Sequence, residues 1–278
     1  MNSTLPMQLQ QVPPRQGALW VRRGFQVFGK QPLAISGLFA AFVFGVFVLS
    51  LLPLLGPVLL LAVLPLVSLG FMLASRRVLE GQLPTPKVFI EPLRAGRPRQ
   101  RALLQLGVVY AVCSLAIIWL SDTVDGGALD ALMQALGDPK AGTEAVQQQL
   151  ADPRLEAGLA LRFGLATLLS VPFWHAPALT HWGGQGAAQS LFSSTLACWR
   201  NKGAFLVFGA VWAGLVLGFA LIANLVFGLL GQPQLVALAA MPASLLLSTI
   251  FYASLYFSFA DCFLTPVSDT PSTPQELP

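Results

Sequence analysis

Six long apolar runs, separated by polar segments, dominate the pattern of this chain. They cover residues 33–55, 57–75, 102–120, 159–179, 204–230 and 235–260. Each run is long enough to cross the hydrocarbon core of a bilayer as a helix, which takes about 20 residues. The runs are continuous, whereas the strands of a membrane barrel alternate apolar and polar residues. The pattern therefore predicts an all-α polytopic membrane protein with six transmembrane helices.

Composition agrees with this prediction. Hydrophobic residues make up 55% of the chain and charged residues only 10%, whereas soluble proteins carry about 25% charged residues. No cleavable signal peptide is expected, because the first apolar run begins at Leu33 and leads directly into a second one. We expect an N-terminal segment at 1–32, a transmembrane domain at 33–262 and a disordered tail at 263–278.

Basic residues gather on one side of the predicted bundle. All but three of the 16 lie before span one, between spans two and three, or between spans four and five. Because Lys and Arg near span ends stay in the cytoplasm, both termini are expected there, in a bacterial inner membrane. The loop at 121–157 is then periplasmic. It is acidic, and we expect short helices in "ALDALMQAL" and "GTEAVQQQL" rather than a calcium loop, whose ligands are more densely spaced.

Amphipathic helices are predicted before spans one and five, lying in the membrane interface. The apolar face of the first consists of Ala18, Val21, Phe25 and Phe28, and that of the second of Ala188, Phe192, Leu196 and Trp199.

The two spans that follow these helices also resemble each other. Small residues recur every four positions, at Gly37, Ala41 and Gly45 in span one and at Ala210, Gly214 and Gly218 in span five. This spacing permits close helix contact. The turns "LLGP" and "LLGQP" follow, and each next span contains a proline, Pro65 or Pro242. These likenesses favour a parallel internal repeat over chance similarity, and they predict that spans one and five pack together.

The stretch "FWHAPALTHW" at 173–182 contains both histidines. Its tryptophans are typical of a membrane interface, and Pro177 predicts that the helix kinks or ends there. His175 lies inside an apolar span, where ionisable groups usually face the bundle interior and find a partner. A structural hydrogen bond is the main interpretation and a ligand role the alternative. The candidate polar site comprises His175, His181, Arg162 and Asp261.

A metal site is not expected. Cys198 and Cys262 lie near the same span ends as the two histidines, but no pair has the spacing of a zinc motif. The thiols stay reduced on the cytoplasmic side, so no disulfide is expected. No nucleophile motif, phosphate loop or cofactor motif is present, which predicts a protein that is not an enzyme and has no cofactor.

Two stretches, "FWHAPALTHW" and "CWRNKGAF" at 198–205, carry a family resemblance. The chain resembles an uncharacterised family of betaproteobacterial six-span inner-membrane proteins, whose members have similar Trp-His-Ala-Pro-Ala-Leu and Cys-Trp-Arg-Asn stretches. The resemblance covers most of the chain. It implies the fold and the location, and the family has no assigned activity.

Two functions stay open at this point. The first is a non-enzymatic membrane component that organises lipids or partner proteins at the cytoplasmic face. Its candidate contacts with anionic lipids, worth about 1 kcal/mol each, are Arg94, Arg97, Arg99 and Arg101, although an ordinary topology signal explains the same cluster. The alternative is a small-solute transporter or permease with proline-broken spans. The expected partners are the lipid bilayer and other membrane proteins, and no nucleic acid.

Overall fold

A computed structural model of the chain describes residues 7–138, 142–232 and 234–263. This part is mainly helical and contains no strand. Six spans are long and apolar enough to cross a membrane. They are α2 (Pro32–Ser50), α3 (Leu55–Leu79), α4 (Arg97–Asp125), α7 (Pro153–Phe173) continued by α8 (Ala176–Gly183), α10 (Lys202–Leu229) and α11 (Leu235–Phe263). The predicted all-α polytopic fold is confirmed, and the predicted tail, beyond Phe263, lies outside the described residues.

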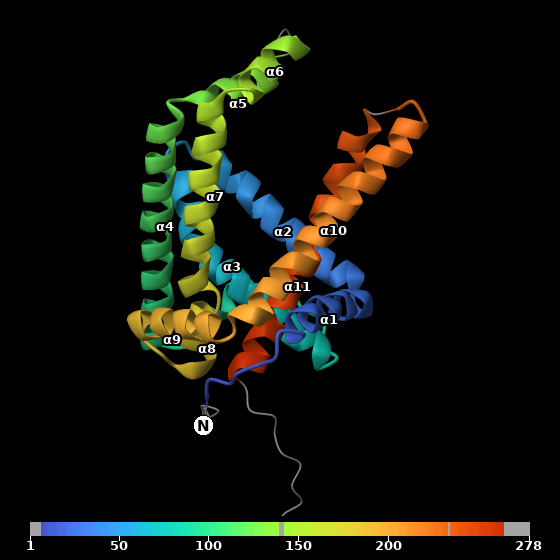
Figure 1. Cartoon of the computed structure of the whole chain (residues 1–278). Coiled ribbons are helices and arrows are strands. Elements are labelled where there is room, and N and C mark those ends of the chain that lie inside the picture. The colour runs from blue at the N-terminus through green and yellow to red at the C-terminus, as the bar shows by residue number, and fades with distance from the viewer. Residues whose placement is uncertain (1–6, 139–141, 233, 264–278) are drawn as a thin grey trace, which may run out of the picture.

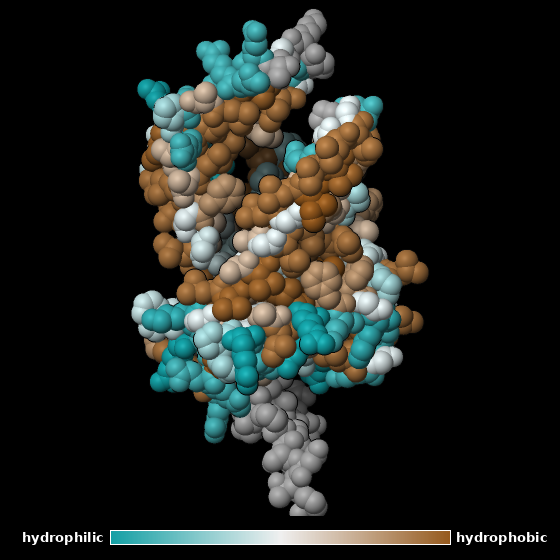
Figure 2. Space-filling view, turned by 45° about the vertical axis from the view of Figure 1, so that its right-hand side comes forward, coloured by the Kyte–Doolittle hydropathy of each residue, from teal (hydrophilic) through white to brown (hydrophobic). Residues whose placement is uncertain are grey.

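Shorter helices lie at the two ends of the bundle (Figure 1). The end that we call the basic end contains α1 (Gln16–Lys30), the 3-10 turns η1 (Pro86–Phe89) and η2 (Glu91–Arg94), α8, and α9 (Ala187–Arg200). The opposite, acidic end contains α5 (Ala128–Gly137) and α6 (Thr143–Leu150), which confirms both helices predicted in the acidic loop. In Figure 2 a hydrophilic band covers the basic end below a wide hydrophobic zone.

The spans are packed together at the basic end and diverge toward the acidic end. Helices α4 and α7 form one upright arm and α10 and α11 another, with a gap between the arms that widens away from α9 (Figure 1). Burial follows this shape. In α11 the buried residues run from Thr249 to Phe263, and in α10 only Ala223 is buried beyond Trp212. The core of the protein therefore lies in the half of the bundle next to the basic end.

Helix α1 is part of this core and packs mainly on α10 and α11. A Cβ added at Gly17 would overlap the carbonyl oxygen of Ala204, so the two backbones are in direct contact there. Trp20 is completely buried, whereas Phe25 of the predicted apolar face is 40% exposed. The predicted helix is confirmed, and its predicted apolar face is divided between the core, where Val21 is buried, and the exposed surface, where Phe25 lies. Small residues select the packing face, because they allow a close approach that large side chains prevent.

Helix α9 also turns small residues toward the protein and large apolar side chains outward. Phe192 and Trp199, from its predicted apolar face, are 70% and 71% exposed. The buried side consists of Ser190, Ser194, Ala197 and Cys198, which pack toward α7 and α8. The large apolar side chains of α9 are thus free to contact lipid.

The prediction that spans one and five pack closely is wrong. Helices α2 and α10 make no substantial contact, and a Cβ added at Gly37, Gly45, Gly214 or Gly218 would meet no atom within 4 Å. The order of an amphipathic segment followed by two spans does recur. Helix α1 packs mainly on α10 and α11, and α9 packs mainly on α7 and α8, so each of these two helices contacts spans outside its own unit.

Candidate functional site

His175 lies at the break between α7 and α8 and is completely buried. The helix breaks just before Pro177, which lies in the first turn of α8. Backbone N–H groups in the first turn have no acceptor within the helix, so a proline there costs no hydrogen bond. The backbone N–H of His175 donates to Ser194 Oγ at 3.0 Å, and His175 Nε2 lies 3.2 Å from Ser258 Oγ. Ser258 already donates its one proton to the Leu255 carbonyl. This contact favours the tautomer of His175 with its proton on Nε2, and Nδ1 is then left without a hydrogen-bond partner among the described residues.

Aromatic rings surround this hydrogen-bonded histidine. The rings of Phe205, Phe259 and Phe263 lie 5.4–6.0 Å from the imidazole, centroid to centroid. Trp174 Nε1 donates to Ser258 Oγ at 3.1 Å, and its ring contacts Phe205, Phe208 and Phe251. Trp174 is therefore half-buried and joins α11 through Ser258, in addition to its predicted place near a span end. The site around His175 has the contacts of a packed, hydrogen-bonded helix junction.

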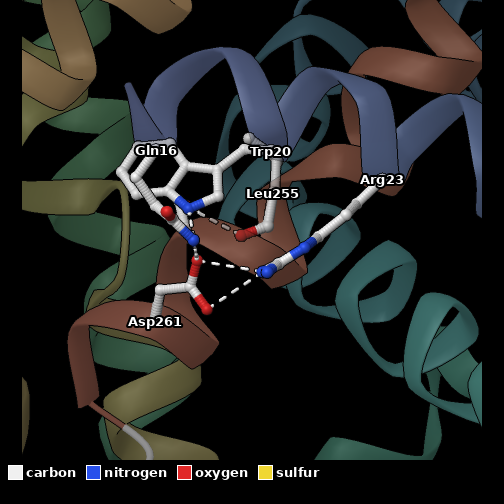
Figure 3. A network of polar contacts seen from close by, with 6 residues as sticks. Gln16, Trp20, Arg23, Leu255 and Asp261 are labelled. Atoms are coloured by element: carbon white, nitrogen blue, oxygen red, sulfur yellow. Dashed lines mark hydrogen bonds and ion pairs between the residues drawn. The ribbon is translucent and has the colours of Figure 1, made fainter. Parts of the chain in front are cut away.

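Asp261 occupies a second polar centre, between α11 and α1 (Figure 3). Its carboxylate accepts hydrogen bonds from Gln16 Nε2, from Trp20 Nε1 at 2.8 Å and from Arg23 Nη1 at 3.0 Å. The three donors follow one face of α1. Bonds to a charged acceptor are stronger than neutral ones, so this carboxylate anchors α1 to the end of α11.

The other two candidate residues lie apart from both centres. Arg162 forms an ion pair with Asp122 that joins α7 to α4 near the acidic end. His181, in α8, contacts the ring of Trp182, and its Nδ1 has no partner among the described residues. The structure therefore divides the four predicted residues among separate places and does not assemble one site from them.

Asn201 is a structural residue that the sequence did not reveal. It is 2% exposed, accepts from the Val12 N–H at 2.8 Å and donates to the Gln10 carbonyl at 3.0 Å. The Gln10 N–H donates to the Cys262 carbonyl at 2.9 Å. The segment before α1 is thus held against the α9–α10 junction and the end of α11. The "CWRN" stretch contains Asn201, but its partners lie about 190 positions away.

The cysteines are not gathered with other metal ligands. Within the described ranges, no group of three His, Cys, Asp or Glu side chains is close enough to hold a metal ion. Cys198 Sγ donates to the Val171 carbonyl at 3.6 Å. Burial raises the pKa of the Cys198 thiol to about 12, so it is neither ionised nor reactive at neutral pH.

The predicted lipid-contacting arginines lie at the basic end of α4 and before it. Arg97 and Arg101 are exposed, and with Leu104 and Val108 they line a shallow depression of about 510 Å³ on the outer side of α4. Arg94 is also exposed, whereas Arg99 is half-buried and approaches Gly184. None of these four forms an ion pair with a carboxylate in the described part of the chain.

Two cavities lie between the arms. A cleft of about 660 Å³ separates α7 from α10. A smaller cavity of about 220 Å³ lies between α3, α4, α7 and α11. Both are lined in part by Ser170, Trp174 and Phe251, so they adjoin each other.

Comparison with known proteins identifies the family. The chain is 33% identical over 270 residues to a "probable inner membrane protein" of Burkholderia thailandensis, and the alignment covers 96% of this chain and 98% of that protein. The chain belongs to this family of betaproteobacterial inner-membrane proteins. No family model matches it, and no solved structure matches it.

For a multi-pass inner-membrane protein, the exposed apolar side chains of the spans are the surface that faces lipid. Leu104 and Val108 above the arginines of α4 are 54% and 60% exposed. The basic end then lies at the level of the headgroups, where cations and lipid phosphates meet.

Proposed function

We propose that this inner-membrane protein is a non-enzymatic component that organises lipids, and partner proteins associated with them, at the cytoplasmic face. The basic end faces the cytoplasm in this proposal, because basic residues near span ends are retained there. Three described acids lie at this end, and each pairs with a basic residue: Glu80 with Arg76, Glu91 with Arg77, and Asp261 with Arg23. Among the other basic residues, Arg97 and Arg101 lie beside the exposed apolar side chains Leu104 and Val108 of a span, and we assign the headgroup contacts to these two.

The observation that carries the proposal is the exposed side of α4 that lines the shallow depression. Arg97 and Arg101 are one helical turn apart, and Leu104 and Val108 continue the same exposed side toward the membrane interior. One anionic headgroup can contact both guanidinium groups while its acyl chains lie along the apolar side chains. A basic residue near an anionic leaflet contributes about 1 kcal/mol, so the pair supports roughly 30-fold enrichment at most.

Lipid analysis of the protein extracted with its surrounding bilayer in polymer nanodiscs tests this function. We expect anionic lipids to be enriched over the bulk membrane around the parent protein, and the enrichment to fall in an Arg97→Gln, Arg101→Gln double variant. A control with Arg15→Gln and Lys87→Gln removes the same charge from the basic end and should keep the enrichment. Equal lipid composition in all three proteins would contradict the proposal.

The proposed orientation has its own test. Gln148 in α6 and Gln82 after α3 are both exposed, at opposite ends of the bundle. In intact cells, an impermeant thiol reagent should label Gln148→Cys strongly and Gln82→Cys only after the membrane is opened. The reverse pattern would overturn the orientation.

One observation favours a permease as a second candidate function. The smaller cavity is lined by the hydroxyl-bearing residues Ser68, Tyr110, Ser170 and Tyr252, and by Pro65 inside α3, which runs through the proline without a break. Polar groups between membrane spans often mark the path of a solute. Solute uptake in proteoliposomes that is lost in Ser68→Leu, with lipid enrichment unchanged, would favour transport over lipid organisation.

A further inference from the structure

The cleft between α7 and α10 is open along the side of the molecule, and Figure 2 shows the surface hollowed between the two arms. Val171 and Trp174 form one wall, and Phe205, Leu206 and Gly209 form the other. The two helices are joined at the basic end through α9, which packs on α7 and leads into α10. Away from that end, nothing in the described chain fills the space between them.

The walls of the cleft are mainly apolar, and among the lining residues Trp212 has a buried Nε1 with no hydrogen-bond partner in the described part of the chain. The hydroxyl groups of Thr167 and Ser170 donate to carbonyls of their own helix, at 2.8 and 2.7 Å. The Cys198 thiol is likewise directed to the Val171 carbonyl. A water molecule needs several free polar partners, and apolar cavities without them stay dry. In a bilayer, such an open cleft is filled by lipid.

Gly209 widens the cleft at the level of these apolar side chains. A Cβ at this position would meet nothing within 4 Å, so close helix packing does not require the glycine. The residue is exposed although it lines the cleft. Its missing side chain therefore leaves room that a second molecule can occupy.

The ammonium group of Lys202 lies at the basic end of the same cleft. Lys202 is the first residue of α10, and its Nζ lies 5.2 Å from the centroid of the Trp199 ring. Both residues line the cleft, and Lys202 forms no ion pair with a described carboxylate. An exposed Trp next to a Lys is typical of headgroup depth, where the ammonium group can meet a lipid phosphate.

We propose that this cleft binds one anionic diacyl phospholipid, with one acyl chain between α7 and α10 and the phosphate at Lys202. The inference rests on the proposed lipid-organising function but assigns it a separate site, with one molecule retained per protein. Lipid tails are as apolar as the walls of the cleft, so burying a chain supplies little driving force. Shape and the headgroup charge complementary to Lys202 provide the selectivity.

Native mass spectrometry of the full chain, released from mild detergent, measures this retained lipid. The parent protein should carry one adduct with the mass of an anionic diacyl phospholipid. Gly209→Leu, which fills the cleft, should lose it. Gly214→Leu is the matched control, because Gly214 is equally open and does not line the cleft; this variant should keep the adduct. Lys202→Gln should weaken retention about fivefold, the equivalent of one interfacial charge.

Three results would overturn the proposal. The first is a lipid adduct that persists in Gly209→Leu. The other two are an adduct of the parent protein with a zwitterionic phospholipid, or with a lipid of another class such as an isoprenoid phosphate. Val171→Phe narrows the cleft from the opposite wall and gives the same test if Gly209→Leu fails to fold. Failure here is separable from failure of the proposed function, because the Arg97 and Arg101 variants measure enrichment at α4 and leave the cleft intact.

Discussion

The basic end of the bundle and the outer part of the α10–α11 arm contain the same kinds of residue in different surroundings. Gly17 of α1 and Gly107 of α4 each face the backbone of a crossing helix so closely that a Cβ would overlap it. Gly214 and Gly218, farther out on α10, face open space. A stripe of small residues thus permits close packing of helices. The helices come into contact only where a second helix crosses the stripe.

Polar anchors follow the same division. At the basic end, Asp261, Asn201 and Ser258 join segments that are distant in sequence. In the outer arm the hydrogen bonds of Asn224 and Ser244 return to carbonyls of their own helices. Tertiary contacts therefore stabilise the basic end, whereas the outer arm depends on the hydrogen bonds within each helix and on the surrounding lipid.

Substitution of glycines in the two regions should give the largest difference. Gly17→Leu forces a side chain into the carbonyl of Ala204 and displaces α1 from the core. Overpacking typically costs about 1 to 3 kcal/mol, and we expect the upper end because a backbone must move. Gly214→Leu should leave stability unchanged. Thermal unfolding in detergent measures both, and similar melting temperatures for the two variants would remove the distinction between the regions.

Removing the carboxylate of Asp261 should have the next largest effect. In Asp261→Ala, the donors on Gln16, Trp20 and Arg23 lose their shared acceptor. Leaving buried donors unpaired costs about 1 to 3 kcal/mol. Glu80→Ala is the control, since its pair with Arg76 is exposed and joins residues of one turn, where such pairs contribute about 0.3–0.5 kcal/mol. Equal losses in chemical unfolding would show that Asp261 is not an anchor.

The ion pair near the acidic end should contribute less than the Asp261 anchor. Arg162 and Asp122 have side chains that are 24% and 52% exposed, so water and salt screen their attraction. Arg162→Gln should cost at most about 1 kcal/mol, and the loss should shrink at high salt. A loss as large as that of Asp261→Ala would place a second strong anchor between α4 and α7.

The smallest expected signal is thiol labelling at the packed end. Because burial raises the Cys198 pKa to about 12, the thiol stays protonated below that pH and its thiolate forms only above it. Between pH 7 and pH 9 a small alkylating reagent should leave Cys198 unmodified. A cysteine introduced at the exposed Gln232, in the turn after α10, should react at an ordinary rate that rises with pH. Rapid modification of Cys198 would show that its thiol ionises readily despite its burial.

Local properties of the sequence determined the six spans, the separation of basic from acidic segments, and the short helices of the acidic loop. Hydrophobic length and helical period set these features residue by residue. The sequence also marked Asp261 and His175 as polar groups near span ends. It placed the break in span four only approximately, because Pro177 is accommodated in the first turn of the next helix.

Only the tertiary structure decided which faces pack. In a bilayer the apolar side of a helix is satisfied by lipid as well as by protein, so hydrophobic pattern does not distinguish the two. The packing faces of α1 and α9 were set instead by small residues that met a crossing backbone and by polar groups that found partners. Those partners lie as far as 245 positions away along the chain, as in the bond from Gln16 to Asp261. Such pairings exist only once the helices have assembled.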